Sequence, residues 1–192
     1  LAAMLSSLPA VDRSKQTWTQ PEQTGNEGLL IPAQVNYVGK AANLYDLGYA
    51  LHGSSTVVSR YLGASWLWDR IRVQGGAYGA FCSFDPFSGI LGYASYRDPN
   101  VLNTLDNYDG SGAFLRKLDI NQDELSKAII GPIGDLDSYQ LPDAKGYTSM
   151  MRHLTGIDEV YRQRMRDEIL GTTAEDFHSF ADILDRGASQ GV

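Results

Sequence analysis

The fold is built around one stretch, Arg70-Ile-Arg-Val-Gln-Gly-Gly-Ala-Tyr-Gly-Ala-Phe-Cys-Ser-Phe84. A helical pattern that begins near Ser55 leads into it. Gly75 and Gly76 are expected to end this helix, because glycine readily adopts the left-handed conformation of a C-terminal cap. The next segment, Ala77–Phe84, is rich in aromatic and small residues, which predicts a strand. A helix, a reversal and a strand therefore follow one another within a few residues.

A second strand is expected after a short turn. Asp85-Pro-Phe-Ser-Gly89 has the composition of a turn, because proline fixes φ and glycine permits positive φ. Ile90–Tyr96 then predicts the partner strand of a hairpin. Beyond it, Asp98 is expected to be the N-cap of a helix, with Pro99 at the first helical position.

The helix before the glycines is apolar over much of its surface. Apolar residues recur at helical spacing, namely Val57, Tyr61, Ala64, Trp68 and Ile71. A helix of this kind is expected to lie buried under a sheet. Its two tryptophans, Trp66 and Trp68, are accordingly expected in the core.

The flanking segments complete the pattern. An earlier strand is expected around Ala33–Val38, and one helix is expected from Val101 to about Leu118 with a possible break at Gly110. Asn121 begins a further helix with the form of a capping box. Only helical patterns follow it to the end of the chain.

Two details of the helical region are testable against the structure. The helix that begins at Asn121 is expected to end near Gly131-Pro132, because proline interrupts helical hydrogen bonding. Farther along, Met150 and Met151 lie on an apolar helix face and are expected to fill the core.

These elements predict an α+β fold with an antiparallel-rich mixed sheet, covered by helices on one face and followed by a helical C-terminal tail. Residues 1–28 are polar over most of their length and are expected to form an N-terminal connecting segment. Residues 29–192 are expected to form one C-terminal α+β domain of a larger protein.

Arg72 and Tyr78 are the candidate functional residues of the central stretch. They are six residues apart, and the reversal between helix and strand can bring them to the same end of the layer. A guanidinium offers a planar fork of donors, and a phenol offers one O–H donor to a developing oxyanion. In the alternative interpretation, Arg72 complements the dipole at the helix C-terminus and Tyr78 packs in the core.

Three motifs carry a resemblance to a known family. Arg72-Val-Gln-Gly-Gly-Ala-Tyr78-Gly is followed by Ser95-Tyr-Arg-Asp-Pro-Asn100 and by Thr104-Leu-Asp-Asn-Tyr-Asp109. Together they resemble the C-terminal region of the presequence protease branch of the pitrilysin/insulysin zinc metallopeptidases. The resemblance extends from about Leu29 to the end of the chain and implies the metallohydrolase fold of that family.

In that family this half of the enzyme lacks the zinc. The resemblance implies that Arg72 and Tyr78 reach across a closed chamber to a peptide substrate held at the zinc site of the N-terminal half of the same protease. The substrates implied are targeting presequences or other unstructured peptides. The alternative is a domain of the same fold that serves as a non-catalytic scaffold or peptide-binding subunit. A zinc motif in the rest of the protein would separate the two.

The chain itself shows no zinc motif. Its three histidines, His52, His153 and His178, lie far apart in sequence and in neither a His-x-x-Glu-His nor a His-Glu-x-x-His frame. We therefore expect zinc to bind outside this chain and the isolated chain to be inactive. Gly75-Gly-Ala-Tyr-Gly79 is not a dinucleotide fingerprint, because it follows a helix and opens a strand. The chain also has no Gly-x-Ser-x-Gly elbow.

Composition restricts the possible partners. The formal net charge is −7 over 192 residues, which argues against nucleic acid. It is compatible with basic peptides, but a charge of this size is also ordinary for a soluble domain and is better explained so. No apolar run approaches the roughly 20 residues of a membrane span, so no membrane partner is expected. Cys82 is the only cysteine, which favours a reducing compartment such as a bacterial cytoplasm, a mitochondrial matrix or a plastid stroma.

Overall fold

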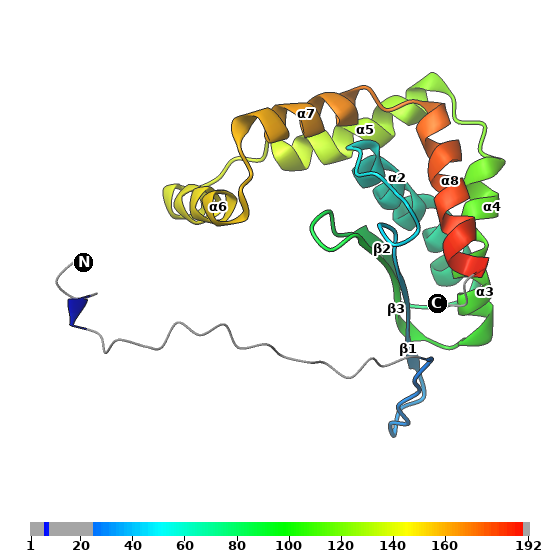
Figure 1. Cartoon of the computed structure of the whole chain (residues 1–192). Coiled ribbons are helices and arrows are strands. Elements are labelled where there is room, and N and C mark those ends of the chain that lie inside the picture. The colour runs from blue at the N-terminus through cyan, green and yellow to red at the C-terminus, as the bar shows by residue number, and fades with distance from the viewer. Residues whose placement is uncertain (1–5, 8–24, 190–192) are drawn as a thin grey trace.

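A computed structural model describes residues 6–7 and 25–189. Its sheet has three antiparallel strands in the order β1-β3-β2 (Figure 1). Their bounds are Asn36–Asn43 for β1, Gly79–Phe84 for β2 and Ile90–Asp98 for β3. The α+β class is thereby confirmed. The predicted connecting segment, residues 1–28, lies mostly outside the described residues.

The hairpin between β2 and β3 forms where the turn composition predicted it. The Asp85 carboxylate accepts hydrogen bonds from the backbone N–H groups of Phe87 and Ser88, at 3.1 and 3.2 Å. Gly89 closes the turn with φ +75°, and a Cβ at this position would overlap the ring of Tyr45. Glycine is therefore required here by both conformation and space.

The helix under the sheet has two parts with different hydrogen bonding. It begins as α2, Ser54–Leu62, and continues directly as a π-helix, η1, Gly63–Gln74. The predicted stripe is buried only in part: Val57 and Ile71 are 0–1% exposed, Tyr61 is partly buried, and Ala64 and Trp68 are exposed. Val58, Leu62 and Leu67, each 0% exposed, complete the buried face. The wider turns of a π-helix change the angle between successive side chains.

This change of pitch decides the positions of the two tryptophans. Trp66 packs against the core, with its ring stacked on Phe114 at 5.0 Å. Trp68 is 48% exposed, so its predicted core position is wrong. The prediction assumed the angular spacing of an α-helix throughout, whereas the wider turns of η1 direct Trp68 away from the buried stripe.

The helix ends at the predicted glycines. Gly76 has φ +79°, which confirms the left-handed cap. Its N–H donates to the Arg72 carbonyl at 3.1 Å, and the Ala77 N–H donates to the Ile71 carbonyl at 3.0 Å. These bonds satisfy the last helical carbonyls and direct the chain into β2.

The prediction for Asp98 is wrong. It belongs to β3, and helix α3, Leu102–Asp109, begins later with Val101 as its N-cap. The Asp98 carboxylate is fully buried and accepts hydrogen bonds from Thr104 Oγ1 at 2.7 Å and from the Asn100 N–H at 2.8 Å. Both oxygens therefore bond within the strand-to-helix connection, and α3 begins three residues after Pro99.

Helices cover one face of the sheet. The expected break at Gly110 is present, since α3 is followed by a separate helix, α4, Ser111–Arg116. The last helix, α8, Ala174–Ser189, returns to pack beside α4 (Figure 1). It buries Phe177, Phe180 and Ala181, and therefore belongs to the helical layer that covers the sheet.

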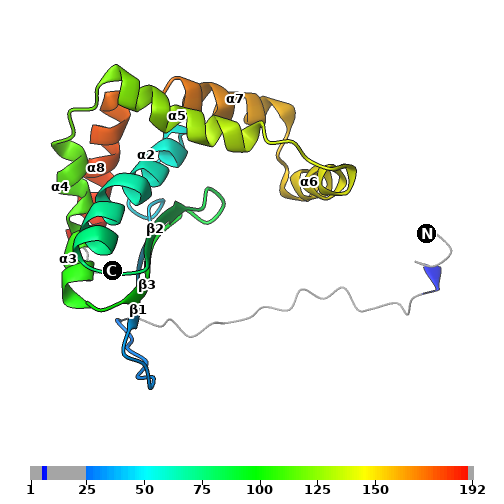
Figure 2. The ribbon, with the colours of Figure 1, turned by 180° about the vertical axis from the view of Figure 1, so that it is seen from behind.

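Three helices extend away from this layer. α5, Gln122–Leu136, lies beside α7, Glu159–Leu170, and α6, Pro142–Thr155, lies beyond them (Figures 1 and 2). The helix does not end at Pro132 as predicted. α5 is held against α2 on both sides of this residue: Gly131 lies against the Arg60 side chain, and Asp135 pairs with the same guanidinium.

The expected burial of the two methionines is also wrong. Met150 and Met151 are 50% and 38% exposed, and no residue of α6 is buried. Their apolar face follows helical spacing, but α6 lies too far from the sheet to reach the core (Figure 2). Among the residues described, no helix combines the length and the apolar character that crossing a membrane requires.

The second face of the sheet is open. Side chains alternate along each strand, so that Val38, Leu91 and Tyr93 face the helices and are buried. Tyr37 and Phe81 lie on the opposite face and are 58% and 57% exposed. No described helix covers this face.

Candidate functional site

Arg72 and Tyr78 meet at the junction between η1 and β2. Arg72 is in the last helical turn, and Tyr78 directly precedes the strand. The Arg72 Nη1 donates a hydrogen bond to the carbonyl of Tyr78. Its Cζ lies 5.5 Å from the centroid of the Tyr78 ring. The reversal at the glycines therefore brings the two side chains together, as the sequence predicts.

The junction is fixed by backbone contacts to β3 and to the segment that follows it. The Tyr78 N–H donates to the Tyr96 carbonyl at 3.1 Å. Asn100 Nδ2 donates to the Gly75 carbonyl at 2.7 Å. The first and second motifs of the sequence thus meet at one place, where Asn100 of the second motif bonds Gly75 of the first.

Both side chains have donors that the described residues leave free. Tyr78 is 63% exposed, so the alternative that it packs in the core is wrong. Its hydroxyl has no hydrogen-bond partner among residues 6–7 and 25–189. Arg72 likewise has no carboxylate partner within these ranges, and its one side-chain hydrogen bond uses a single nitrogen. The remaining guanidinium donors are available to an oxygen of a bound molecule.

Three aromatic residues that the sequence interpretation did not assign to the site form a row of contacts with the pair. The Arg72 guanidinium lies 4.4 Å from the centroid of Trp68. The Tyr78 ring meets Tyr96 edge to face at 5.6 Å, and Tyr96 meets Tyr37 in the same way at 5.4 Å. Helical spacing offered a signal for Trp68, which precedes Arg72 by four residues; no local signal pointed to Tyr37.

The described residues do not form a metal site. No group of three or more His, Cys, Asp or Glu side chains that could hold an ion occurs within them. His52 Nδ1 lies 2.8 Å from Ser54 Oγ and 3.8 Å from Asp176 Oδ1. A serine triad would use both ring nitrogens, whereas here both partners face the same one, and Ser54 is buried.

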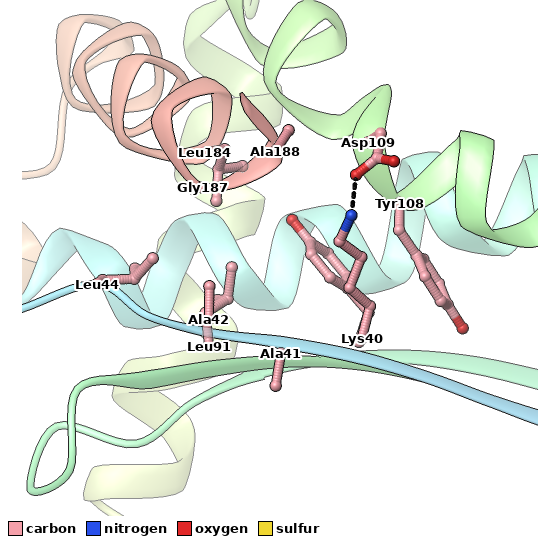
Figure 3. Close-up of a pocket in the computed structure, with 11 residues that line it drawn as sticks. Lys40, Ala41, Ala42, Leu44, Leu91, Tyr108, Asp109, Leu184, Gly187 and Ala188 are labelled. Atoms are coloured by element: carbon pink, nitrogen blue, oxygen red, sulfur yellow. Dashed lines mark hydrogen bonds and ion pairs between the residues drawn. The ribbon is translucent and has the colours of Figure 1, made fainter. Parts of the chain in front are cut away.

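Two other features do not serve as a peptide site. Burial raises the pKa of the Cys82 thiol to about 12, so the thiol stays protonated at neutral pH and is a poor nucleophile. A cavity of about 30 Å³ lies between β1, α3 and α8, and the 2.7 Å ion pair of Lys40 and Asp109 is part of its lining (Figure 3). It has room for about one or two water molecules.

Comparison with known proteins agrees with the motifs. The family model described as the PreP C-terminal domain matches residues 26–192. Presequence protease 1, chloroplastic/mitochondrial, of Arabidopsis thaliana is 58% identical over 176 residues, which are 92% of this chain and 16% of that protein. The mitochondrial presequence protease of Aspergillus oryzae is 35% identical over 154 residues, which are 80% of this chain and 15% of that protein.

A bacterial relative is similar over a comparable part of the chain. Protein HypA of Clostridium perfringens is 35% identical over 159 residues, covering 83% of this chain and 16% of that protein. The chain therefore spans about one sixth of the length of these relatives. With a family model that matches nearly all of its described residues, the chain belongs to the presequence protease family, of which it represents the C-terminal domain.

Proposed function

We propose that the full-length protein is a zinc endopeptidase that degrades targeting presequences or other unstructured peptides, and that this chain supplies Arg72 and Tyr78 to the bound peptide. One observation carries the proposal: within the described residues, an arginine without a carboxylate partner contacts a tyrosine whose hydroxyl has no hydrogen-bond partner. The names of the relatives from Arabidopsis and Aspergillus support the peptidase assignment.

Tyr78 would act on the peptide bond that is cleaved. Its hydroxyl would donate to the carbonyl oxygen of that bond as the oxygen gains negative charge. A fixed donor of this kind stabilises the transition state more than the ground state. The Tyr78 carbonyl and N–H are both hydrogen-bonded, to Arg72 and Tyr96, so the backbone that carries the phenol is held in place.

Arg72 would hold a neighbouring part of the peptide. One of its nitrogens is occupied by the Tyr78 carbonyl, and the others can donate to a peptide carbonyl or carboxylate. Because the Arg72 side chain would contact both Tyr78 and the peptide, it would fix the distance between the peptide and the Tyr78 phenol. This arrangement positions the reacting bond rather than supplying a nucleophile.

The zinc is assigned to the preceding, N-terminal half of the protease, since the described residues do not form a metal site. The peptide would then lie between that half and the junction of η1 and β2. Closure of the two halves would complete the site. The negative net charge of −7 suits positively charged peptides.

The test is Tyr78→Phe in the full-length protein. Loss of one oxyanion donor should lower kcat about 10²–10³-fold. The thermal midpoint should stay unchanged, because the ring and its contact with Tyr96 remain. Tyr147→Phe on α6 is the matched control, since Tyr147 is 62% exposed and lies far from the junction. Wild-type turnover in Tyr78→Phe would refute the role, and a full-length protein without peptidase activity would favour the scaffold alternative.

A further inference from the structure

Trp68 is an exposed tryptophan whose ring contacts a functional candidate. Its side chain is 48% exposed, and among the described residues its ring has no aromatic neighbour and no hydrogen-bond partner. The Arg72 guanidinium lies over this ring at 4.4 Å. The same guanidinium also lies 5.5 Å from the centroid of the Tyr78 ring. Isolated exposed apolar residues are common, but this one faces a cation that has no carboxylate partner.

We propose that Trp68 is a positioning residue of the peptide site: its indole ring holds the Arg72 guanidinium in place before the peptide binds. The inference rests on the proposed function of Arg72. Trp68 itself need not touch the peptide, and its effect passes through the guanidinium.

The physical reason is the flexibility of the arginine side chain. An exposed arginine samples many rotamers, and binding must restrict them. A guanidinium is attracted to the face of an indole by the quadrupole of the ring. With Trp68 on one side and a hydrogen bond to the Tyr78 carbonyl, the free donors of Arg72 have a defined direction. The Arg72 side chain has then lost part of its conformational entropy before the peptide binds, so binding costs less.

The local fold supports this role. Trp68 and Arg72 both belong to η1, whose wider turns take the indole out of the core and leave it beside the guanidinium. π-helical turns often occur at functional sites. An indole that served only to fill the core would be expected among the buried residues, as Leu67 is.

The experiment measures steady-state cleavage of an unstructured fluorogenic peptide by the full-length protease. Trp68→Leu should lower kcat/KM roughly threefold to tenfold, which corresponds to the loss of one partly exposed cation–π contact. The loss should appear mainly in KM, because the Arg72 contact is made in both the ground state and the transition state. Trp68→Phe should restore most of the activity, since the phenyl ring keeps a π face. Tyr147→Leu is the matched control for removal of an exposed ring.

A double-mutant cycle with Arg72→Met tests whether the effect passes through arginine. Trp68→Leu should cause no further loss in the Arg72→Met protein. An equal loss in both backgrounds would show that Trp68 acts by another route and would overturn the inference. If Trp68→Leu has wild-type kinetics while Arg72→Met is impaired, the inference about Trp68 is overturned and the proposed function of Arg72 stands. Wild-type kinetics of Arg72→Met would refute the proposed function of Arg72 and this inference together.

Discussion

The helix Ser54–Gln74 contains two Trp–Arg pairs with the same spacing and different surroundings. Arg70 lies over Trp66 at 4.9 Å, and Arg72 lies over Trp68 at 4.4 Å. Trp66 stacks on Phe114 and donates from Nε1 to the Asn107 carbonyl at 2.8 Å. Trp68 has neither kind of contact within the described residues. The local chemistry of the two pairs is therefore the same, and their surroundings distinguish a structural pair from a candidate functional pair.

The arginines differ in the same way. Arg70 donates to Gln74 and lies 3.8 Å from the Asp69 carboxylate, so its polar partners belong to its own helix. Arg72 instead donates to the carbonyl of Tyr78, across the reversal of the chain. The guanidinium of Arg70 therefore already has acceptors on its own helix. An arginine with unused donors beside an exposed phenol is suited to bind a ligand.

The largest expected effect concerns Trp66. Trp66→Ala should destabilise the helix by about 3 kcal/mol, because it removes the stacked contact with Phe114 and leaves a cavity. Trp68→Ala should change stability by less than about 0.5 kcal/mol. Native-state hydrogen exchange of the amides in residues 54–74 of the full-length protein measures both values. Equal losses of protection would contradict the distinction between the two pairs.

The second effect is on catalysis. Arg72→Lys keeps the positive charge but loses the planar fork, so kcat/KM should fall roughly tenfold to a hundredfold. Arg70→Lys in the same helix should leave kcat/KM within about twofold of wild type, because its partners lie within its own helix. Peptide cleavage by full-length proteins carrying each substitution gives the comparison. A similar loss in both variants would mean that the guanidinium chemistry of Arg72 is not special.

The smallest effect concerns the reversal that brings Arg72 to Tyr78. Gly76→Val should destabilise the protein by about 1–2 kcal/mol, since a β-branched residue is strained at φ +79°. Gly134→Val has a Cβ with nothing within 4 Å and an ordinary φ, so it serves as a control for adding a β-branched side chain to a helix. Thermal midpoints of the full-length variants test this. A Gly76→Val protein as stable as the control would contradict the cap assignment.

Local sequence determined the central stretch well. The glycine that stops the helix and the glycine that closes the turn Asp85–Gly89 have positive φ, which few residue types adopt, and the aromatic and small residues around the turn favour strands. The proximity of Arg72 and Tyr78 followed from the same local pattern, because residues on either side of a short chain reversal must lie close together. The α+β class followed from the order of these elements.

Other features depended on contacts between distant residues. Asp98 has the sequence context of an N-cap, yet its carboxylate bonds Thr104 from within β3. α5 continues through Pro132, which is itself buried, and this part of the helix packs against α2. A proline removes one helical hydrogen bond, and no local pattern reports that another helix packs at this point.

The site shows the same division. The chain by itself determined which residues carry donors and that Arg72 and Tyr78 come together. Only the folded structure shows the wider turns of η1, which place Trp66 against Phe114 in the core and leave Trp68 at the surface. It also shows that Tyr37, from a strand more than forty residues earlier, extends the aromatic row beyond Tyr78. The physical reason is that the backbone conformation of a residue depends mostly on that residue and its near neighbours in sequence. The burial of its side chain depends on which distant segments pack against it.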